Sequence, residues 1–159
     1  MPALQNAHDH RIPAILGGEA GPNPVPRELI EMASHAVFSH AGLFQYSAKA
    51  DMRDGLEAVA AMTEARIGVT AGWDGFSWLD EDGVLQSVAA LNLPVIDKLG
   101  ARDVFLGAFA LALGEEKDME LAARFANTAA GLKCSKSGGR GAIPCRAEIW
   151  EILNGAEAD

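Results

Sequence analysis

Short apolar runs alternate with segments of helical periodicity, and this alternation restricts the possible folds more than any other feature of the chain. The runs at residues 13–16, 36–39 and 67–70 hold no charged side chains and are too short for helices. Such runs are typical of strands that are buried on both faces. Apolar side chains follow helical spacing at 27–33 and 54–63. The alternation predicts an α/β protein with a mostly parallel sheet covered by helices on both faces, a three-layer αβα fold.

The second half of the chain predicts a hairpin followed by helices. Residues 76–79 and 84–88 flank an acidic turn that contains Gly83, which indicates a β-hairpin. A further short strand is expected at 94–96. Three helices are expected at 101–113, at 118–133 and from Arg146 onward. The first of them is apolar on nearly every side, as interior helices are. No domain boundary is visible, so residues 1–159 are predicted to form a single domain.

The charge of the chain argues against two classes of partner. Lys and Arg number 13 against 22 Asp and Glu, which gives a net charge of -9, and the basic residues are scattered. A nucleic-acid surface needs clustered Lys and Arg, and an anionic membrane surface attracts the same residues. No apolar run approaches the roughly 20 residues of a membrane span. We therefore expect neither nucleic acid nor a membrane as a partner.

The two cysteines and the polar N-terminal segment bear on the compartment. Cys134 and Cys145 are too few for a disulfide framework. Two free thiols in the cytoplasm are the simpler interpretation, and a bridge across the intervening Gly-rich segment is the alternative. Residues 1–11 are polar and show no signal peptide. The prediction is a cytoplasmic protein.

The stretch Asp97-Lys98-Leu99-Gly100-Ala101-Arg102-Asp103 joins a short strand to a small-residue turn and the start of the apolar helix. The first amides of a helix have no partner within the helix, and the helix dipole favours negative charge there. Small residues such as Gly100 and Ala101 let a phosphate approach the backbone. Asp103 lies in the same turn, where a carboxylate can accept a proton from a hydroxyl nucleophile. The plainer alternative is that Asp103 only caps the helix.

This stretch resembles the second signature of the ribokinase-type (pfkB family) carbohydrate kinases, Asp-Thr-x-Gly-Ala-Gly-Asp followed by Phe and a Gly-Ala-Phe helix. The matching residues are Asp97, Gly100, Ala101, Asp103, Phe105, Gly107, Ala108 and Phe109. The resemblance implies that Asp103 is the base that deprotonates a sugar hydroxyl. It also implies that the amides of residues 100–103 form the anion hole for the γ-phosphate of Mg-ATP.

Two further segments extend the resemblance to about residues 12–153 and imply a truncated ribokinase-like fold. Thr70, Gly72 and Gly75 belong to a stretch that resembles a family loop lying along the nucleotide, although two glycines are also typical of any turn into a hairpin. Asn127 lies in a segment that resembles the adenine border, or else is an ordinary polar helix position. The family often binds a monovalent cation through the region of Asp97 and the late Gly-rich loop.

The sequence also departs from the family pattern. Arg102 replaces the second Gly of the anion-hole motif; its side chain either clasps the phosphate or fills the phosphate site, and we expect a steric loss. Residues 39–42 hold no carboxylate where the family has an Asn-x-x-Glu motif linked to Mg²⁺. No residue of this chain is therefore assigned as a metal ligand.

The chain is too short for a complete kinase of this family, whose N-terminal half supplies the sugar contacts and a β-sheet lid. Our first hypothesis is the C-terminal, ATP-binding portion of a sugar kinase. The alternative is a catalytically inactive remnant that binds nucleotide weakly or acts in assembly, and a piece of a longer natural protein is a third hypothesis. Whether the chain is an enzyme stays open here. A sheet cut between strands leaves an open edge, so we expect a homodimer or a partner that covers it.

Overall fold

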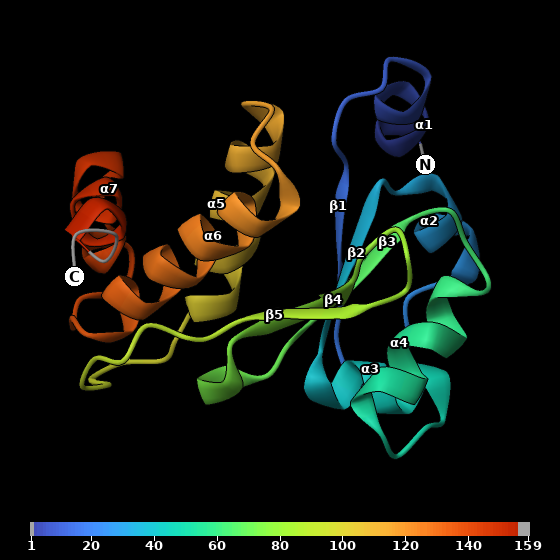
Figure 1. The fold of residues 1–159 in the computed structure, drawn as a ribbon, viewed down its shortest axis with the longest axis horizontal. Coiled ribbons are helices and arrows are strands. Elements are labelled where there is room, and N and C mark those ends of the chain that lie inside the picture. Colours follow the sequence, from blue (N-terminus) through green and yellow to red (C-terminus); the bar gives the residue numbers. More distant parts are fainter. Residues whose placement is uncertain (1, 156–159) are drawn as a thin grey trace. The chain divides into compact units, whose positions relative to one another are not determined.

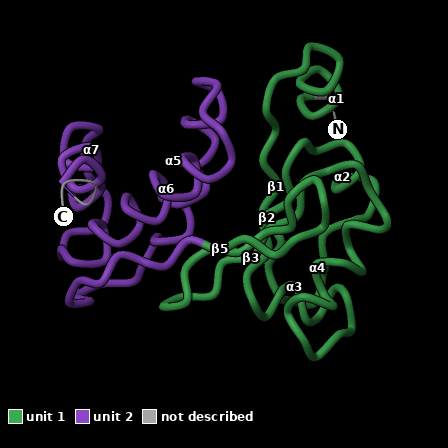
Figure 2. The backbone as a smooth tube through the Cα atoms, in the orientation of Figure 1, with its two compact units in different colours: residues 1–87 green, residues 88–159 purple. Residues whose placement is uncertain are grey.

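The computed structural model describes residues 2–155, and it divides the chain into two compact units, Met1–Ser87 and Val88–Asp159 (Figure 2). The elements of the first unit, in chain order, are α1 (Pro2–Asp9), β1 (Ile15–Gly18), α2 (Arg27–Met32), β2 (His35–Ser39), α3 (His40–Ser47), α4 (Met52–Ala60), β3 (Arg66–Thr70), the 3₁₀ turn η1 (Gly72–Asp74), β4 (Phe76–Leu79) and β5 (Leu85–Val88), which ends at the boundary. The second unit contains α5 (Ala101–Gly114), α6 (Met119–Cys134), the 3₁₀ turn η2 (Gly139–Ala142) and α7 (Arg146–Gly155) (Figure 1).

The sheet of the first unit has five strands in the order β1-β2-β3-β4-β5. The first three run parallel, with Ile15 opposite His35 and His35 opposite Arg66, and β4 returns antiparallel to β3 with Trp78 opposite Gly68. The parallel strands are linked by helices, as crossover connections require, and β4 and β5 are joined by a short turn. The predicted α/β class with a mostly parallel sheet is confirmed.

Alternate residues of two central strands make one face of this sheet apolar. Ala36 and Phe38 on β2 lie beside Ile67 and Val69 on β3, because the parallel register pairs them directly. Side chains of α2, α3 and α4 pack against this face, namely Ile30, Leu43, Leu56 and Val59. All eight are at most 2% exposed, so the helical spacing in the sequence does correspond to buried faces.

The strand β3 needs a glycine on the opposite face of the sheet. A Cβ at Gly68 would come within 2.3 Å of the ring of Phe76, far closer than side chains approach. Phe76 lies across the strand and stacks on Trp78 with ring centroids 5.6 Å apart. The aromatic pair of the hairpin therefore uses the space that a side chain at residue 68 would occupy.

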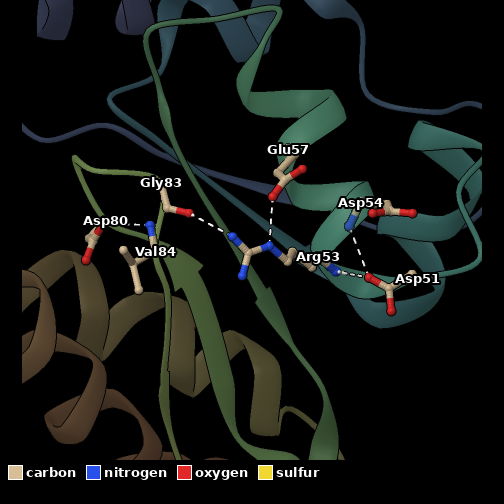
Figure 3. Close-up of polar contacts among 7 residues, drawn as sticks. All are labelled: Asp51, Arg53, Asp54, Glu57, Asp80, Gly83 and Val84. Atoms are coloured by element: carbon tan, nitrogen blue, oxygen red, sulfur yellow. Dashed lines mark hydrogen bonds and ion pairs between the residues drawn. The ribbon is translucent and has the colours of Figure 1, made fainter.

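Polar contacts fix the tip of the β4–β5 hairpin to the start of α4 (Figure 3). Asp51 caps α4 by accepting a hydrogen bond from the backbone N–H of Arg53 at 2.8 Å. The guanidinium of Arg53 reaches the carbonyl oxygen of Gly83 at 3.4 Å. Asp80 accepts from the N–H of Val84 at 2.8 Å, which closes the hairpin turn. The acidic turn of the hairpin is thus also an attachment point for a helix.

One prediction of local structure is wrong, and one helix was not predicted. Residues 94–96 are not a strand; instead the N–H groups of Ile96 and Asp97 both donate to the carbonyl oxygen of Cys134, at 2.8 and 3.0 Å. An extended segment can satisfy its amides at a helix end as well as in a sheet. The polar N-terminal segment forms the helix α1, which no apolar periodicity in the sequence signalled.

The second unit is a helical assembly. The helices α5 and α6 pack along each other, and α7 packs on α6 through Phe125 and Trp150, whose ring centroids are 5.5 Å apart. The segment entering this unit lies close to α6, because a Cβ at Gly131 would come within 2.7 Å of Leu91. Among residues 2–155, no helix is both long and apolar enough to cross a membrane.

Candidate functional site

A cavity of about 600 Å³ opens in the second unit between α5, α6, η2 and α7. Most of its walls are apolar, with Val104, Ala108, Leu111, Phe125, Ile143 and Ile149 among them. Polar and charged groups border the same space, namely Gly100, Asp103, Lys133, Gly139, Arg140 and Arg146. An apolar cavity with a few charged groups at its border is the usual form of a small-molecule site.

The turn at Gly100 places the N-terminus of α5 at this cavity. Gly100 has φ 76° and ψ 5°, a left-handed conformation that favours glycine. Ala101 donates its N–H to the carbonyl oxygen of Lys98 at 3.1 Å, and the first helical bond runs from Val104 N–H to Gly100 at 3.0 Å. Gly100 and Asp103 both line the cavity, whereas the amide of Ala101 is used inside the turn. The amide of Ala101 is therefore engaged within the turn, and the anion hole of residues 100–103 stays a prediction.

The carboxylate of Asp103 is exposed and lies in the first turn of α5, beside the cavity. Arg102 is not one of the residues that line this cavity, and the steric loss expected at the phosphate site stays a prediction. The backbone of Arg102 is helical, and burial lowers the pKa of its guanidinium to about 10, which leaves it protonated at neutral pH. Asp103 therefore lines the cavity.

Lys133 and Asp97 form an ion pair behind the turn. The ammonium of Lys133 lies 2.9 Å from Oδ2 of Asp97, and the Lys133 side chain is 2% exposed against 29% for Asp97. The hydrogen bond from Lys133 lowers the pKa of Asp97, and the N–H of Leu99, which donates to Oδ1 at 2.9 Å, lowers it further. Asp97 thus links the end of α6 to the turn that precedes α5.

The side chain of Asn127 holds a neighbouring segment instead of facing the cavity. Its amide nitrogen donates to the carbonyl oxygen of Val88 at 2.8 Å and to that of Ala89 at 3.3 Å. Asn127 is 8% exposed, and the cavity walls on α6 are Phe125, Ala129 and Lys133. In this geometry the side chain anchors the chain segment that enters the unit, and a contact with a purine stays a prediction.

Ion pairs fasten the Gly-rich segment and the start of α7 at the rim of the cavity. Lys136 contacts Glu148 at 2.5 Å, and Glu148 also accepts the N–H of Cys145 at 2.8 Å. These contacts, the Lys136 hydrogen bond first, lower the pKa of Glu148 to about 2. Arg146 binds Glu115 at the end of α5, with one contact at 2.9 Å. Both cysteines are free thiols, so no bridge spans this segment.

The predicted nucleotide loop lies in the first unit. The hydroxyl of Thr70 donates to the carbonyl oxygen of Phe38 at 3.3 Å. Gly72 and Gly75 adopt positive φ of 59° and 83°, and the N–H of Gly75 donates to the carbonyl oxygen of Gly72 at 3.2 Å. The loop is therefore a tight turn whose shape depends on both glycines. The structure brings these three residues together in one unit and the 100–103 turn together with the cavity in the other.

Sequence reasoning missed the basic side chains of the cavity. Lys133, Arg140 and Arg146 all line it, and none was assigned a role. A signal for Lys133 was present, because it follows Phe125 and Ala129 at helical spacing on the apolar stripe of α6. A lysine in a buried stripe needs a partner. Arg140 and Arg146 gave no comparable signal.

Within the described part of the chain, no group of three or more His, Cys, Asp or Glu side chains could together hold a metal ion. Neighbouring carboxylates of the cavity region are instead paired with Lys or Arg.

Comparison with known proteins gives a family match over most of the chain. The model of the pfkB family carbohydrate kinases matches residues 4–146. The ribokinase of Bacillus subtilis is 35% identical over 149 residues, which cover 92% of this chain and 48% of that protein. The chain therefore spans about half the length of the curated relatives it matches.

Solved structures agree with this match. A protein from Agrobacterium tumefaciens assigned as a ribokinase superposes with a TM-score of 0.88 at 31% identity, covering 98% of this chain and 52% of that one. The ribokinase of Arabidopsis thaliana, complexed with ribose and ATP, gives 0.85 at 24% identity and covers 94% and 50%. A fructokinase double mutant from Vibrio cholerae with fructose, ADP and a potassium ion gives 0.72 at 24% identity and covers 79% and 42%. The predicted ribokinase-like αβα fold, in truncated form, is confirmed.

Proposed function

Because the chain belongs to the pfkB family of carbohydrate kinases, we propose that it is the nucleotide-binding half of an ATP-dependent sugar kinase. The observation on which this rests is the cavity at the start of α5. It places Gly100 and Asp103 beside an apolar space that is also bordered by Lys133, Arg140 and Arg146. The chain covers about half of the length of its relatives. We therefore propose kinase activity only for this chain together with the groups that its relatives carry in their other half.

The cavity fits a nucleotide in size and in chemistry. Its volume of about 600 Å³ is within the roughly 300–1,000 Å³ of ligand sites. Val104, Phe125 and Ile143 offer apolar surface to a purine, and Arg140 offers charge to phosphates. Asn127 would act on the nucleotide through the segment it holds. The family resemblance alone supports nucleotide contacts for Thr70, Gly72 and Gly75.

The residues of the turn have distinct roles in phosphoryl transfer. ATP supplies the γ-phosphoryl group. Asp103 would accept the proton of a sugar hydroxyl, because its carboxylate is exposed and adjoins the cavity. The N-terminus of α5, with Gly100 at its cap, would stabilise the negative charge that grows on the phosphoryl oxygens. Arg102, just before Asp103, contributes a permanent positive charge to the same turn. Mg²⁺ would be held mainly by phosphate oxygens, as is common for this ion.

A second candidate function is a silent nucleotide-binding or assembly module. Two features of the sequence favour it, the Arg at position 102 in place of Gly and the absence of a carboxylate at residues 39–42. Phosphoryl transfer depends mostly on positioning of both substrates, and sugar positioning requires groups outside this chain. The two candidates share the nucleotide cavity and differ in turnover.

Calorimetric titration of Mg-ATP into Gly107→Phe tests the cavity. Gly107 lines it, and a Cβ at this position meets nothing within 4 Å, so the ring enters the space without disturbing α5. We expect the ATP affinity to fall about tenfold or more. Gly114→Phe is the matched control, because Gly114 lies on the same helix, has equal room and does not line the cavity. Equal ATP binding by both variants would refute the nucleotide site.

Turnover separates the two candidates. ADP release is measured against a panel of sugars for the chain and for Asp103→Asn. Turnover that is lost in Asp103→Asn while ATP still binds supports the kinase and the role of Asp103 as base. ATP binding without turnover by the unmodified chain supports the silent module. Undiminished turnover in Asp103→Asn would contradict the proposed base.

The edge strand β1 offers a place for a partner. It is the last strand of the sheet on its side, and Ile12 just before it is 55% exposed. An open edge pairs readily with another strand, so we propose that a second copy or another partner covers it, in a cytoplasmic protein. The native mass of the purified chain, measured by light scattering, tests the homodimer.

A further inference from the structure

Lys133 is an unusual residue for the place it occupies. The whole residue is 1% exposed, on the face of α6 that also carries the buried Ala129 and Phe125. A lysine is almost never fully buried unless its charge is paired, because desolvation of an ammonium is costly. The contacts of its Nζ atom therefore decide what the residue does.

The ammonium binds two oxygens of one residue. Nζ donates to the main-chain carbonyl oxygen of Asp97 at 2.9 Å and to its Oδ2 at 2.9 Å. The remaining carboxylate oxygen accepts the N–H of Leu99, and the N–H of Asp97 donates to Cys134. Every polar group of Asp97 thus has a partner, and the turn that leads to Gly100 is fixed to the end of α6.

A carbonyl oxygen and a carboxylate oxygen that face one small cation are typical ligands of a hard monovalent ion. The resemblance described from the sequence places a monovalent cation in this region. The donor set observed here does not fit a free ion, because the two oxygens are already bound to an ammonium. A second cation on the same oxygens would lie next to the Lys133 charge in a poorly solvated place, where like charges repel strongly.

We propose that the Lys133 ammonium is a tethered monovalent cation, which holds Asp97 and the turn before α5 without a dissolved ion. An ammonium and a potassium ion carry the same charge and are similar in size, so the substitution needs little rearrangement. The tether also raises the effective concentration of the cation at Asp97 far above that of a free salt. The stability of the turn should therefore be independent of potassium.

Thermal unfolding without nucleotide tests this inference separately from the proposed function. The unmodified chain is melted in KCl and in choline chloride at equal ionic strength, and we expect the same Tm in both. Loss of ATP binding would refute the nucleotide site and leave this result unaffected. A saturable rise of Tm with KCl in the unmodified chain would overturn the inference, because it would mean that a free ion still has a place to bind.

Two variants at Lys133 extend the test. Lys133→Ala removes the ammonium and leaves room for an ion, and we expect its Tm in choline chloride to be about 10 °C lower. KCl should restore about 5 °C in a saturable manner. Lys133→Met fills the space of the side chain without a charge, and KCl should not restore it. No response of the Ala variant to KCl, or an equal response of the Met variant, would contradict an ion position at Asp97.

Lys136→Ala is the control for the loss of a lysine. Lys136 lies three positions after Lys133, and its side chain is 44% exposed. The substitution removes its ion pair with Glu148. We expect a small fall of Tm that is the same in both salts. If either Lys133 variant fails to fold, the potassium independence of the unmodified chain still decides the question.

Discussion

The two units of this chain are stabilised in different ways. Among the residues described, the first unit buries one polar side chain, Ser77, whereas the second buries Asn127, Thr128 and Lys133, all on α6. The first unit packs three helices on an apolar sheet face. The second leaves a cavity open, and buried polar contacts there supplement the apolar packing of α5, α6 and α7. A scaffold and a candidate binding site thus differ in their kind of stabilisation within one short chain.

The largest expected effect tests the apolar side of this comparison. Phe38→Ala removes a ring that is 1% exposed in the core of the first unit, and we expect the free energy of unfolding to fall by about 3–5 kcal/mol. Urea denaturation followed by circular dichroism measures it. Ile12→Ala is the control, because Ile12 is 55% exposed and its loss should change stability by less than about 0.5 kcal/mol. Similar losses in both variants would mean that the core does not dominate this unit.

The next effect tests the polar side. Asn127→Asp keeps the shape of the side chain and replaces the donor that reaches Val88 and Ala89 with a carboxylate oxygen. We expect a loss of about 2–3 kcal/mol at neutral pH, because an unsatisfied charge would face two carbonyl oxygens. Burial raises the pKa of such a carboxyl, so the loss should shrink as the pH falls toward about 4, where the group is protonated and can donate. A loss that does not change with pH would contradict the role of Asn127 as a donor.

The sequence predicted elements that depend on apolar packing better than contacts that depend on polar pairs. Two central strands and the hairpin of the first unit were predictable because apolar periodicity is local: 36–39, 67–70 and the hairpin all became strands near the expected bounds. The helix α1 of the same unit gave no such signal. The helices α5, α6 and α7 also begin within one residue of their predicted starts, since Asp118 caps α6 and Gly100 caps α5. Apolar periodicity indicates which face of a helix or strand is buried. This can be read from the sequence without knowing which element packs against that face.

The candidate site was only partly predictable. The motif resemblance pointed to Gly100 and Asp103, and the cavity includes both. Long-range polar pairs such as Lys133 with Asp97, which are 36 positions apart, leave no periodic pattern in a single sequence. The segment 94–96 was misassigned for the same reason, because its amides bond to the end of α6 and no local signal distinguishes that from a strand.

A smaller effect compares two glycines associated with α5. Gly100→Ala places a side chain at φ 76°, with nothing within 4 Å of its Cβ, so backbone strain alone should cost about 1 kcal/mol. Gly107→Ala lies inside the helix with equal room and should gain up to about 1 kcal/mol. Opposite changes of Tm are therefore expected from the same substitution. A gain in both variants would mean that the turn at Gly100 is not left-handed in solution.

The smallest effect concerns the rim of the cavity and depends on pH. The Lys136 hydrogen bond and the N–H of Cys145 lower the pKa of Glu148 to about 2 from its ordinary value of 4.5. A carboxyl whose pKa is lowered on folding stabilises the protein above its unfolded pKa, and this contribution is lost as the pH falls from about 4.5 through about 2. Glu148→Gln should therefore flatten the decline of Tm in that window and leave Tm near neutral pH slightly lower.

Glu151→Gln is the matched control, because Glu151 is an exposed carboxylate of the same helix and forms no ion pair within residues 2–155. Its curve of Tm against pH should follow that of the unmodified chain more closely than the Glu148→Gln curve does. If the two variants give the same curve, the contacts of Glu148 do not hold the start of α7 in solution. The polar contacts that hold the second unit would then be those of Asn127 and Lys133 on α6 and the pair of Arg146 with Glu115.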